Sequence, residues 1–221
     1  KWVLIHCLYY LGAMLLVMLP VISWEIVSGA VLAAILHCFI DILKFTYMSY
    51  KDRQKKVTQI LERNVFFIDQ LLHGTLLAGI SCWFVQNNVK FHKSEILVNF
   101  FNIVGIPEVQ TLTWILALLI IHKPANIAIS RLLVIYKPEN KDENEDKKQD
   151  TNAGRFIGTV ERAIIIIFLF LEQYAAIGLV LTAKSIARYD KISKEKDFAE
   201  YYLLGTLIST LIAIVVSLLF S

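Results

Sequence analysis

The chain has 221 residues, a formal net charge of +3 and a hydrophobic fraction of 57%. Soluble domains hold roughly 45–50% apolar residues, so this fraction and the mean hydropathy of +0.58 exclude an ordinary soluble domain. The basic residues cluster in loops between apolar runs, which is typical of membrane topology and argues against a nucleic-acid-binding surface. Cys7, Cys38 and Cys82 lie in apolar runs without paired spacing, so we expect buried thiols.

The first half of the chain contains three apolar runs that are long enough to cross a bilayer. We expect transmembrane helices over residues 2–19, 26–45 and 65–85, because a span needs about 20 apolar residues. The loop 50–63 between the second and third runs holds five Lys or Arg residues and two acidic residues. The positive-inside rule therefore places this loop in the cytoplasm.

The next apolar runs are shorter or interrupted. Residues 96–106 are too short to span and are predicted to be a re-entrant or interfacial segment. A fourth span begins near Val109, and Pro124 is expected either to kink this helix or to end it. A further helical segment is predicted over residues 125–136, near the cytoplasmic face.

The last third begins with a charged segment. Residues 137–153 are predicted to form a disordered cytoplasmic loop. One long helix is expected over 154–184, with Glu172 at its middle, and a last span over 201–220. Alternation of spans puts the connection 185–200 outside, although it carries four basic residues. Because of this conflict, we expect the fifth span to be tilted or broken at Glu172.

These elements predict an all-α, polytopic transmembrane bundle with about six membrane-embedded helices. Its parts are N-terminal membrane helices over 1–136, the charged loop over 137–153, and C-terminal helices of the same bundle over 154–221. The protein is expected to interact with the lipid bilayer and with an unidentified substrate or partner protein, and no nucleic acid is expected.

Two His/Asp pairs stand out within the apolar runs. His37 and Asp41 are four residues apart, as are Asp69 and His73, so each pair shares one helix face. At ~1.5 Å per residue, both pairs and His6 fall within about two turns of the predicted cytoplasmic boundary. Ionisable groups inside apolar helices usually face the bundle interior and mark functional sites. We therefore predict one cluster from three helices.

Imidazole and carboxylate groups together are ligands that suit Zn²⁺, Mn²⁺ or Fe²⁺. The predicted metal ligands are His6, His37, Asp41, Asp69 and His73. Asp69 is also the candidate general base. The leading functional hypothesis is a metal-dependent membrane hydrolase that opens to the cytoplasm and acts on a lipid-linked or phosphorylated substrate. His122 and Glu161 are weaker candidates at similar depth.

Other interpretations of the same residues stay open. The cluster is equally consistent with hydrogen bonding between helices, and Asp41 with capping its helix or pairing with Lys44. Glu161 and Arg162 favour anchoring at the membrane boundary. The alternative functions are a transporter, or another ion- or proton-binding membrane protein, and a structural membrane subunit. A transporter needs a polar path beyond the cluster, and Glu172 with its neighbour Gln173 is the hint of one in the sequence.

Several motifs together resemble a known family. They are His37-Cys-Phe-Ile-Asp41, Phe67-Ile-Asp69-Gln70-Leu-Leu-His73, Gly154-Arg155-Phe-Ile-Gly158 and Gln173-Tyr174-Ala-Ala-Ile-Gly178. The pattern resembles the bacterial membrane family catalogued as domain of unknown function 3307, which has no settled activity. The resemblance implies a multi-pass protein of the bacterial inner membrane. The family's usual opening helix, with its own His/Asp motif, is missing here, which indicates a fragment. The His-x-x-x-Asp pattern is also similar to that of inner-membrane proteins labelled metal-dependent hydrolases, by analogy alone.

Overall fold

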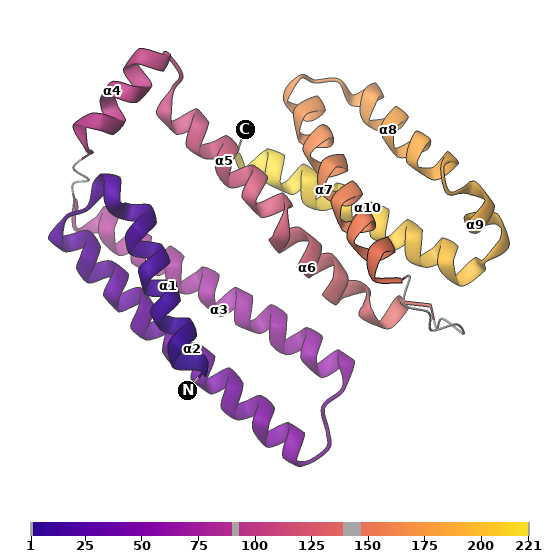
Figure 1. Ribbon diagram of the computed structural model, residues 1–221, viewed down its shortest axis with the longest axis horizontal. Helices are drawn as coiled ribbons and strands as arrows, with labels where there is room; N and C mark the ends of the chain where they lie inside the picture. The colour runs from indigo at the N-terminus through magenta and orange to yellow at the C-terminus, as the bar shows by residue number, and fades with distance from the viewer. Residues whose placement is uncertain (1, 90–92, 139–146, 221) are drawn as a thin grey trace. The chain divides into compact units, whose positions relative to one another are not determined.

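The computed structural model describes residues 2–89, 93–138 and 147–220 (Figure 1). Every regular element in these residues is a helix, and five helices are long and apolar enough to cross a membrane, with shorter apolar helices beside them. The predicted all-α transmembrane class is confirmed. The chain divides into two compact units, Lys1–Ile106 and Pro107–Ser221. The division expected at residues 137–153 falls inside the second unit, and residues 139–146 of that loop lie outside the described residues.

The first unit contains the three predicted spans. They are α1 (Trp2–Met18), α2 (Trp24–Arg53) and α3 (Gln59–Gln86), with a short 3-10 turn, η1 (Leu19–Val21), after α1. Both α2 and α3 run into the predicted basic loop, so the connection between them is only residues 54–58. The helices therefore continue beyond the predicted ends of their apolar runs.

Capping and small residues explain how these helices begin and pack. The side chain of Ser23 accepts the backbone N–H of Ile26 at the start of α2, and Thr58 does the same for Leu61 in α3. The buried residues of α2 are mostly small, which lets its neighbours approach closely: Gly29, Ala30, Ala33, Ala34, Ile26 and His37.

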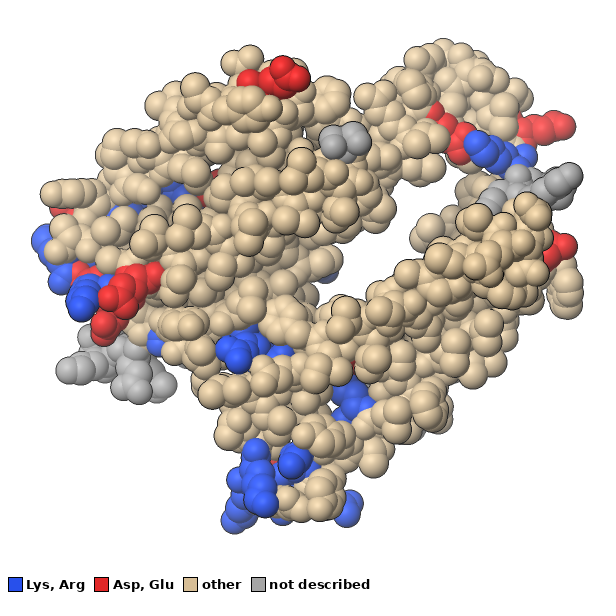
Figure 2. Space-filling view, turned by 180° about the vertical axis from the view of Figure 1, so that it is seen from behind, with Lys and Arg blue, Asp and Glu red and all other residues tan. Residues whose placement is uncertain are grey.

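Large apolar side chains remain exposed along the helices of both units. Leu8, Leu71 and Leu211, for example, each expose more than half of their surface. Figure 2 shows broad flanks without charged residues, with Lys, Arg, Asp and Glu confined to small patches on the face drawn. Such flanks are costly in water and stable in lipid, so the bilayer is the environment of this protein.

The short segment after α3 is confirmed as too short to span. Helix α4 (Glu95–Val104) has 10 residues and ends at Gly105, whose φ of 72° is the left-handed conformation that stops a helix. Its first residue is preceded by Ser94, which donates its backbone N–H to the Pro20 carbonyl at 2.8 Å. This hydrogen bond ties the start of α4 to the turn after α1.

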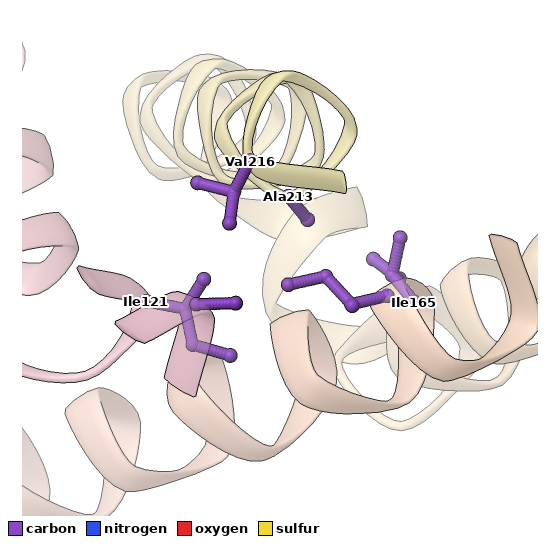
Figure 3. Close-up of a cluster of buried hydrophobic side chains, with 6 residues drawn as sticks. Ile121, Ile165, Ala213 and Val216 are labelled. Carbon is purple, nitrogen blue, oxygen red and sulfur yellow. The ribbon is translucent and has the colours of Figure 1, made fainter. Parts of the chain in front are cut away.

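The second unit is built around three long helices. Its elements are α5 (Glu108–Ile121), α6 (Lys123–Leu132), η2 (Leu133–Tyr136), α7 (Lys147–Phe170), α8 (Tyr174–Ile186), α9 (Tyr189–Lys194) and α10 (Lys196–Phe220). Ile121 of α5, Ile165 of α7 and Ala213 and Val216 of α10 point toward one another in its core (Figure 3). Helix α7 begins at Lys147, earlier than the expected start at residue 154.

Pro124 lies where one helix ends and the next begins. Of the two outcomes predicted for it, a kink or a helix end, the helix end is the one found. Helix α5 ends at Ile121, and α6 begins at Lys123 with the proline in its first turn. The Ile121 carbonyl, released from its helical partner by this break, accepts a hydrogen bond of 2.9 Å from Nε of Arg162. The same guanidinium donates to Ser209 at 3.0 Å and to Asn126 at 2.7 Å.

Arg162 therefore joins four segments of the second unit, and it is only 1% exposed. Its neighbour Glu161 is 4% exposed and pairs with Lys184. The interpretation of these two residues as boundary anchors is wrong, because both lie in the helix interface. Gly158 makes room for the guanidinium, since a Cβ there would lie 3.3 Å from an Arg162 nitrogen.

The prediction of a single helix over residues 154–184 is wrong. The predicted alternative, a break at Glu172, is confirmed. Glu172 has a φ of 57° between α7 and α8, and α8 packs back against α7 (Figure 1). Glu172 lines a cavity together with Pro107 and Phe220, the first and last parts of the unit. It therefore lies at one end of the unit and not at the middle of a span.

The hairpin of α7 and α8 removes the topological conflict. Because α8 returns along α7, the connection after it lies at the end of the unit that holds Lys137 and Arg155. The basic residues between positions 185 and 200 then gather with other basic residues at one end. The positive-inside rule predicts that this end faces the cytoplasm, and it makes the same prediction for the loop between α2 and α3.

This topology predicts the outcome of cysteine labelling. In a background lacking the three native cysteines, Lys56→Cys and Ser193→Cys are expected to react with an impermeant maleimide from the same side of membrane vesicles. Glu172→Cys is expected to react from the opposite side. All three positions are exposed, so access is set by the membrane. Labelling of Ser193→Cys and Glu172→Cys from one side would contradict the hairpin.

Candidate metal centre

Asp41 of α2 lies at the centre of the predicted cluster. Its Oδ2 is 3.4 Å from Nε2 of His37, one helical turn earlier, and 3.6 Å from Nε2 of His6 on α1. Its Oδ1 is 3.9 Å from Nε2 of His73 on α3. Three helices thus bring three imidazoles to one carboxylate. These residues converge as the sequence predicts.

Asp69 is the second carboxylate, and its two oxygens have different surroundings. Oδ2 accepts hydrogen bonds from Nζ of Lys44 at 2.8 Å and from Nε2 of Gln70 at 3.1 Å. Oδ1 lies 3.6 Å from Nδ1 of His73. Lys44 therefore pairs with Asp69, and the alternative pairing of Lys44 with Asp41 is not the one found.

A backbone contact fixes the orientation of the His73 ring. Its Nδ1 lies 2.8 Å from the Asp69 carbonyl oxygen, to which an Nδ1–H donates. The lone pair of this tautomer is then on Nε2, which is the atom nearest to Asp41. The ring of Tyr10 stacks on His37 with centroids 4.1 Å apart and restrains that imidazole in turn.

The centre is buried but its polar atoms are not satisfied. His37 and Asp69 are 7% and 5% exposed, whereas the side chain of His6 is 64% exposed. Both ring nitrogens of His37, Nε2 of His73 and Oδ1 of Asp69 are buried without a hydrogen-bond partner among the described residues. Such orphaned groups are costly in a low-dielectric interior unless something else binds them.

The spacing of the donors fits a small divalent cation. Bonds of about 2.1 Å in tetrahedral geometry put neighbouring ligand atoms about 3.4 Å apart. The contacts of 3.4, 3.6 and 3.9 Å around Asp41 are near this value and too long for good hydrogen bonds. Among the residues that the structure describes, two groups have the geometry to hold an ion, His6-His37-Asp41 and Asp41-Asp69-His73, and Asp41 belongs to both.

A cavity of about 440 Å³ lies beside the centre, between α2 and α3. Lys44 and Asp69 are part of its wall, and Tyr47 and Asn64 are its other polar lining residues. The remaining lining side chains are aliphatic, from both helices. This mixture of polar and aliphatic lining residues suits a ligand with a polar group attached to an apolar chain. At 1.5 Å per residue, Asp69 lies about 15 Å along α3 from the start of this helix at Gln59.

The weaker candidates belong to the second unit. His122 is exposed at the break between α5 and α6, and Glu161 pairs with Lys184 within that unit. Sequence reasoning missed Lys44 as the partner of Asp69, and it missed Tyr10. The spacing held a signal for both, because Lys44 is three residues after Asp41 and Tyr10 is four after His6.

The helices and the cluster define a polytopic α-helical membrane protein with a buried His/Asp centre. Residues 1–101 match the model of a family described as a protein of unknown function, DUF3307, and the resemblance seen in the sequence is confirmed over these residues. They include all five predicted ligands, while the motifs after residue 154 lie outside the match. No curated protein and no solved structure matches the chain.

Proposed function

We propose that this protein is a metal-dependent membrane hydrolase that acts on a lipid-linked or phosphorylated substrate. The observation that carries the proposal is the convergence of three imidazole Nε2 atoms on the Asp41 carboxylate at 3.4–3.9 Å. Buried ring nitrogens without partners add to it. If the contacts around Asp41 only joined helices, short hydrogen bonds would be expected at this carboxylate instead.

Either of two groups would hold the cation, His6-His37-Asp41 or Asp41-Asp69-His73, and Asp41 belongs to both. Zn²⁺, Mn²⁺ and Fe²⁺ all accept this set of nitrogen and oxygen donors. A bound divalent ion would supply a Lewis acid for a phosphoryl or carbonyl oxygen and would make water more acidic. Its charge would also offset that of Asp41, which stabilises a carboxylate inside the bundle.

If His6, His37 and Asp41 hold the cation, Asp69 is not needed as a ligand, and we propose that it acts as the general base through Oδ1. Lys44 and Gln70 hold Oδ2, so the orientation of the carboxylate is fixed and Oδ1 faces His73. In the hydrolysis of a phosphate ester, Asp69 would take a proton from the attacking water while the water oxygen bonds to phosphorus. Asp69 would then pass this proton to the ester oxygen while the bond between the ester oxygen and phosphorus breaks.

The adjacent cavity favours a substrate with a lipid tail. Its aliphatic lining matches an acyl or isoprenoid chain, and the ammonium of Lys44 matches an anionic head group. We further propose that the protein resides in the inner membrane of a bacterium, in line with the family resemblance.

The test is phosphate release by the purified protein in detergent, with phosphatidic acid or a lipid diphosphate as substrate. Release is expected to require added Zn²⁺, Mn²⁺ or Fe²⁺ and to fall at least about 100-fold in His37→Ala. His122→Ala is the matched control, because it removes an exposed histidine of the second unit. No metal-dependent release from either lipid, or equal release by parent and His37→Ala, would contradict this proposal.

A structural role is the second candidate, and the Lys44–Asp69 ion pair favours it. This pair joins α2 to α3 at 2.8 Å, and it would hold the helices together without any metal. A structural cluster predicts that neither the parent nor His37→Ala binds metal, and that the substitution changes only stability. The hydrolase predicts loss of metal from a protein that remains folded.

A further inference from the structure

The second unit contains a cavity of about 450 Å³ that the proposed hydrolase does not use. It lies where α6 and η2, the first turns of α7, the end of α8 and the start of α10 meet. Four basic residues are part of its wall: Lys137, Arg155, Lys184 and Arg188. Among the described residues, no Asp or Glu lines it. We call this feature the basic cavity.

The charge of the basic cavity is only partly compensated. Lys184 is paired with Glu161, which is not a lining residue, and its ammonium also donates to Thr206 at 3.3 Å. The structure gives Arg155 and Arg188 no carboxylate partner within 4.0 Å among the described residues. Within the described part of the chain, two guanidiniums therefore carry positive charge at the cavity wall that no carboxylate offsets. The guanidinium is the group that binds phosphate oxygens in a bidentate manner.

The cavity also offers neutral hydrogen-bond donors. The hydroxyl of Tyr202 is buried without a hydrogen-bond partner among the described residues, and this side chain is part of the wall. Its ring lies under Lys184, with Nζ 5.4 Å from the centroid. Ser130 adds another hydroxyl to the lining. A buried donor without a partner is costly, so an anion that accepted from it would be stabilised.

The position of the cavity suits a ligand at the membrane surface. It lies at the end of the second unit where the basic residues gather, opposite the end that holds Glu172. Basic pockets between transmembrane helices at this level bind the head groups of anionic lipids. The same residues would also accept a soluble phosphate compound.

We propose that the basic cavity binds a phosphate group, presented by an anionic lipid head group or by a soluble phosphate compound. Arg155 and Arg188 would bind its oxygens, and Tyr202 would donate one hydrogen bond. The proposal goes beyond the hydrolase and does not depend on it, because these residues belong to the second unit and share none with the metal centre.

The experiment is calorimetric titration of the full chain in phosphatidylcholine nanodiscs with two probes, short-chain phosphatidic acid and inorganic phosphate. Saturable binding of either probe is expected, and Arg155→Gln/Arg188→Gln should weaken it at least about tenfold. Lys194→Gln/Lys196→Gln is the control, since it removes the same charge from the neighbouring segment outside the cavity wall. It should change the binding constant less than about twofold.

The two probes separate the sources of the phosphate. Binding of phosphatidic acid alone supports a lipid head group, and binding of both probes supports a site for free phosphate. Tyr202→Phe removes one hydroxyl with little change in shape, so it tests the site even if the double variant folds poorly. It should weaken binding by about three- to fivefold. Failure of both probes to bind, or equal losses in the double variant and its charge control, would overturn the proposal.

Discussion

Asp41→Asn is expected to lower the affinity of the purified protein for Zn²⁺ by at least about 100-fold, the largest loss of any single change at the centre. Asp41 is the residue that both candidate ligand groups share, and all three histidine Nε2 atoms lie within 3.9 Å of its carboxylate. The amide keeps the shape of the side chain but removes the charge that attracts the cation. Competition with a fluorescent zinc chelator in detergent measures the change.

His6→Ala supplies the internal comparison for Asp41→Asn. The side chain of His6 is 64% exposed, so water can replace it, and a loss of about tenfold is expected. Thermal unfolding of each metal-free variant checks that the fold is retained. Equal zinc affinities in Asp41→Asn and the parent would show that the carboxylate is not a ligand.

Arg162→Leu is expected to lower the free energy of unfolding of the second unit by about 3 kcal/mol. The guanidinium is 1% exposed and donates to the Ile121 carbonyl, the Asn126 side chain and the Ser209 hydroxyl. Leucine fills part of the space but leaves buried acceptors without donors. The measurement is unfolding of the purified protein in detergent, followed by circular dichroism.

The control for Arg162 is Arg155→Leu, which removes an exposed guanidinium from the same helix, α7. Its effect should stay within about 0.5 kcal/mol, as for most surface substitutions. Arg162→Lys keeps the charge but loses the planar fork, so its stability should fall between those of the parent and Arg162→Leu. Unchanged unfolding of Arg162→Leu would mean that the hydrogen bonds of this guanidinium are not needed for folding.

Much of the first unit followed from the sequence because its signals are local. Apolar runs and the basic loop predicted α1, α2 and α3, and the four-residue spacing of His37 with Asp41 predicted that they share a helix face. What the sequence left open was which groups pair across helices. Helix spacing allows Lys44 to pair with Asp41, but the packing of α2 on α3 places its ammonium beside Asp69 instead. A choice of this kind depends on helix rotation, which periodicity does not report.

The second unit departed further from expectation for a related reason. The run over residues 154–184 reads as one apolar helix, and only the polar pair Glu172-Gln173 hints at a turn. Glutamate rarely adopts a positive φ, so its composition gives little warning of the hairpin that forms there. The position of Arg162 along its helix predicts an anchor, but position along a helix does not say which face is buried, and this side chain is 1% exposed. Its partners come from positions 36 to 47 residues away along the chain.

The measurement that tests the metal centre most directly is the metal content of the purified protein beside the His37→Ala/Asp69→Ala variant. Inductively coupled plasma mass spectrometry of both proteins in detergent would report zinc, manganese and iron together. The proposed centre predicts near-stoichiometric metal in the parent and little in the variant, with both proteins folded. No metal in either protein, even after incubation with each ion, would contradict it and leave helix packing as the role of the cluster.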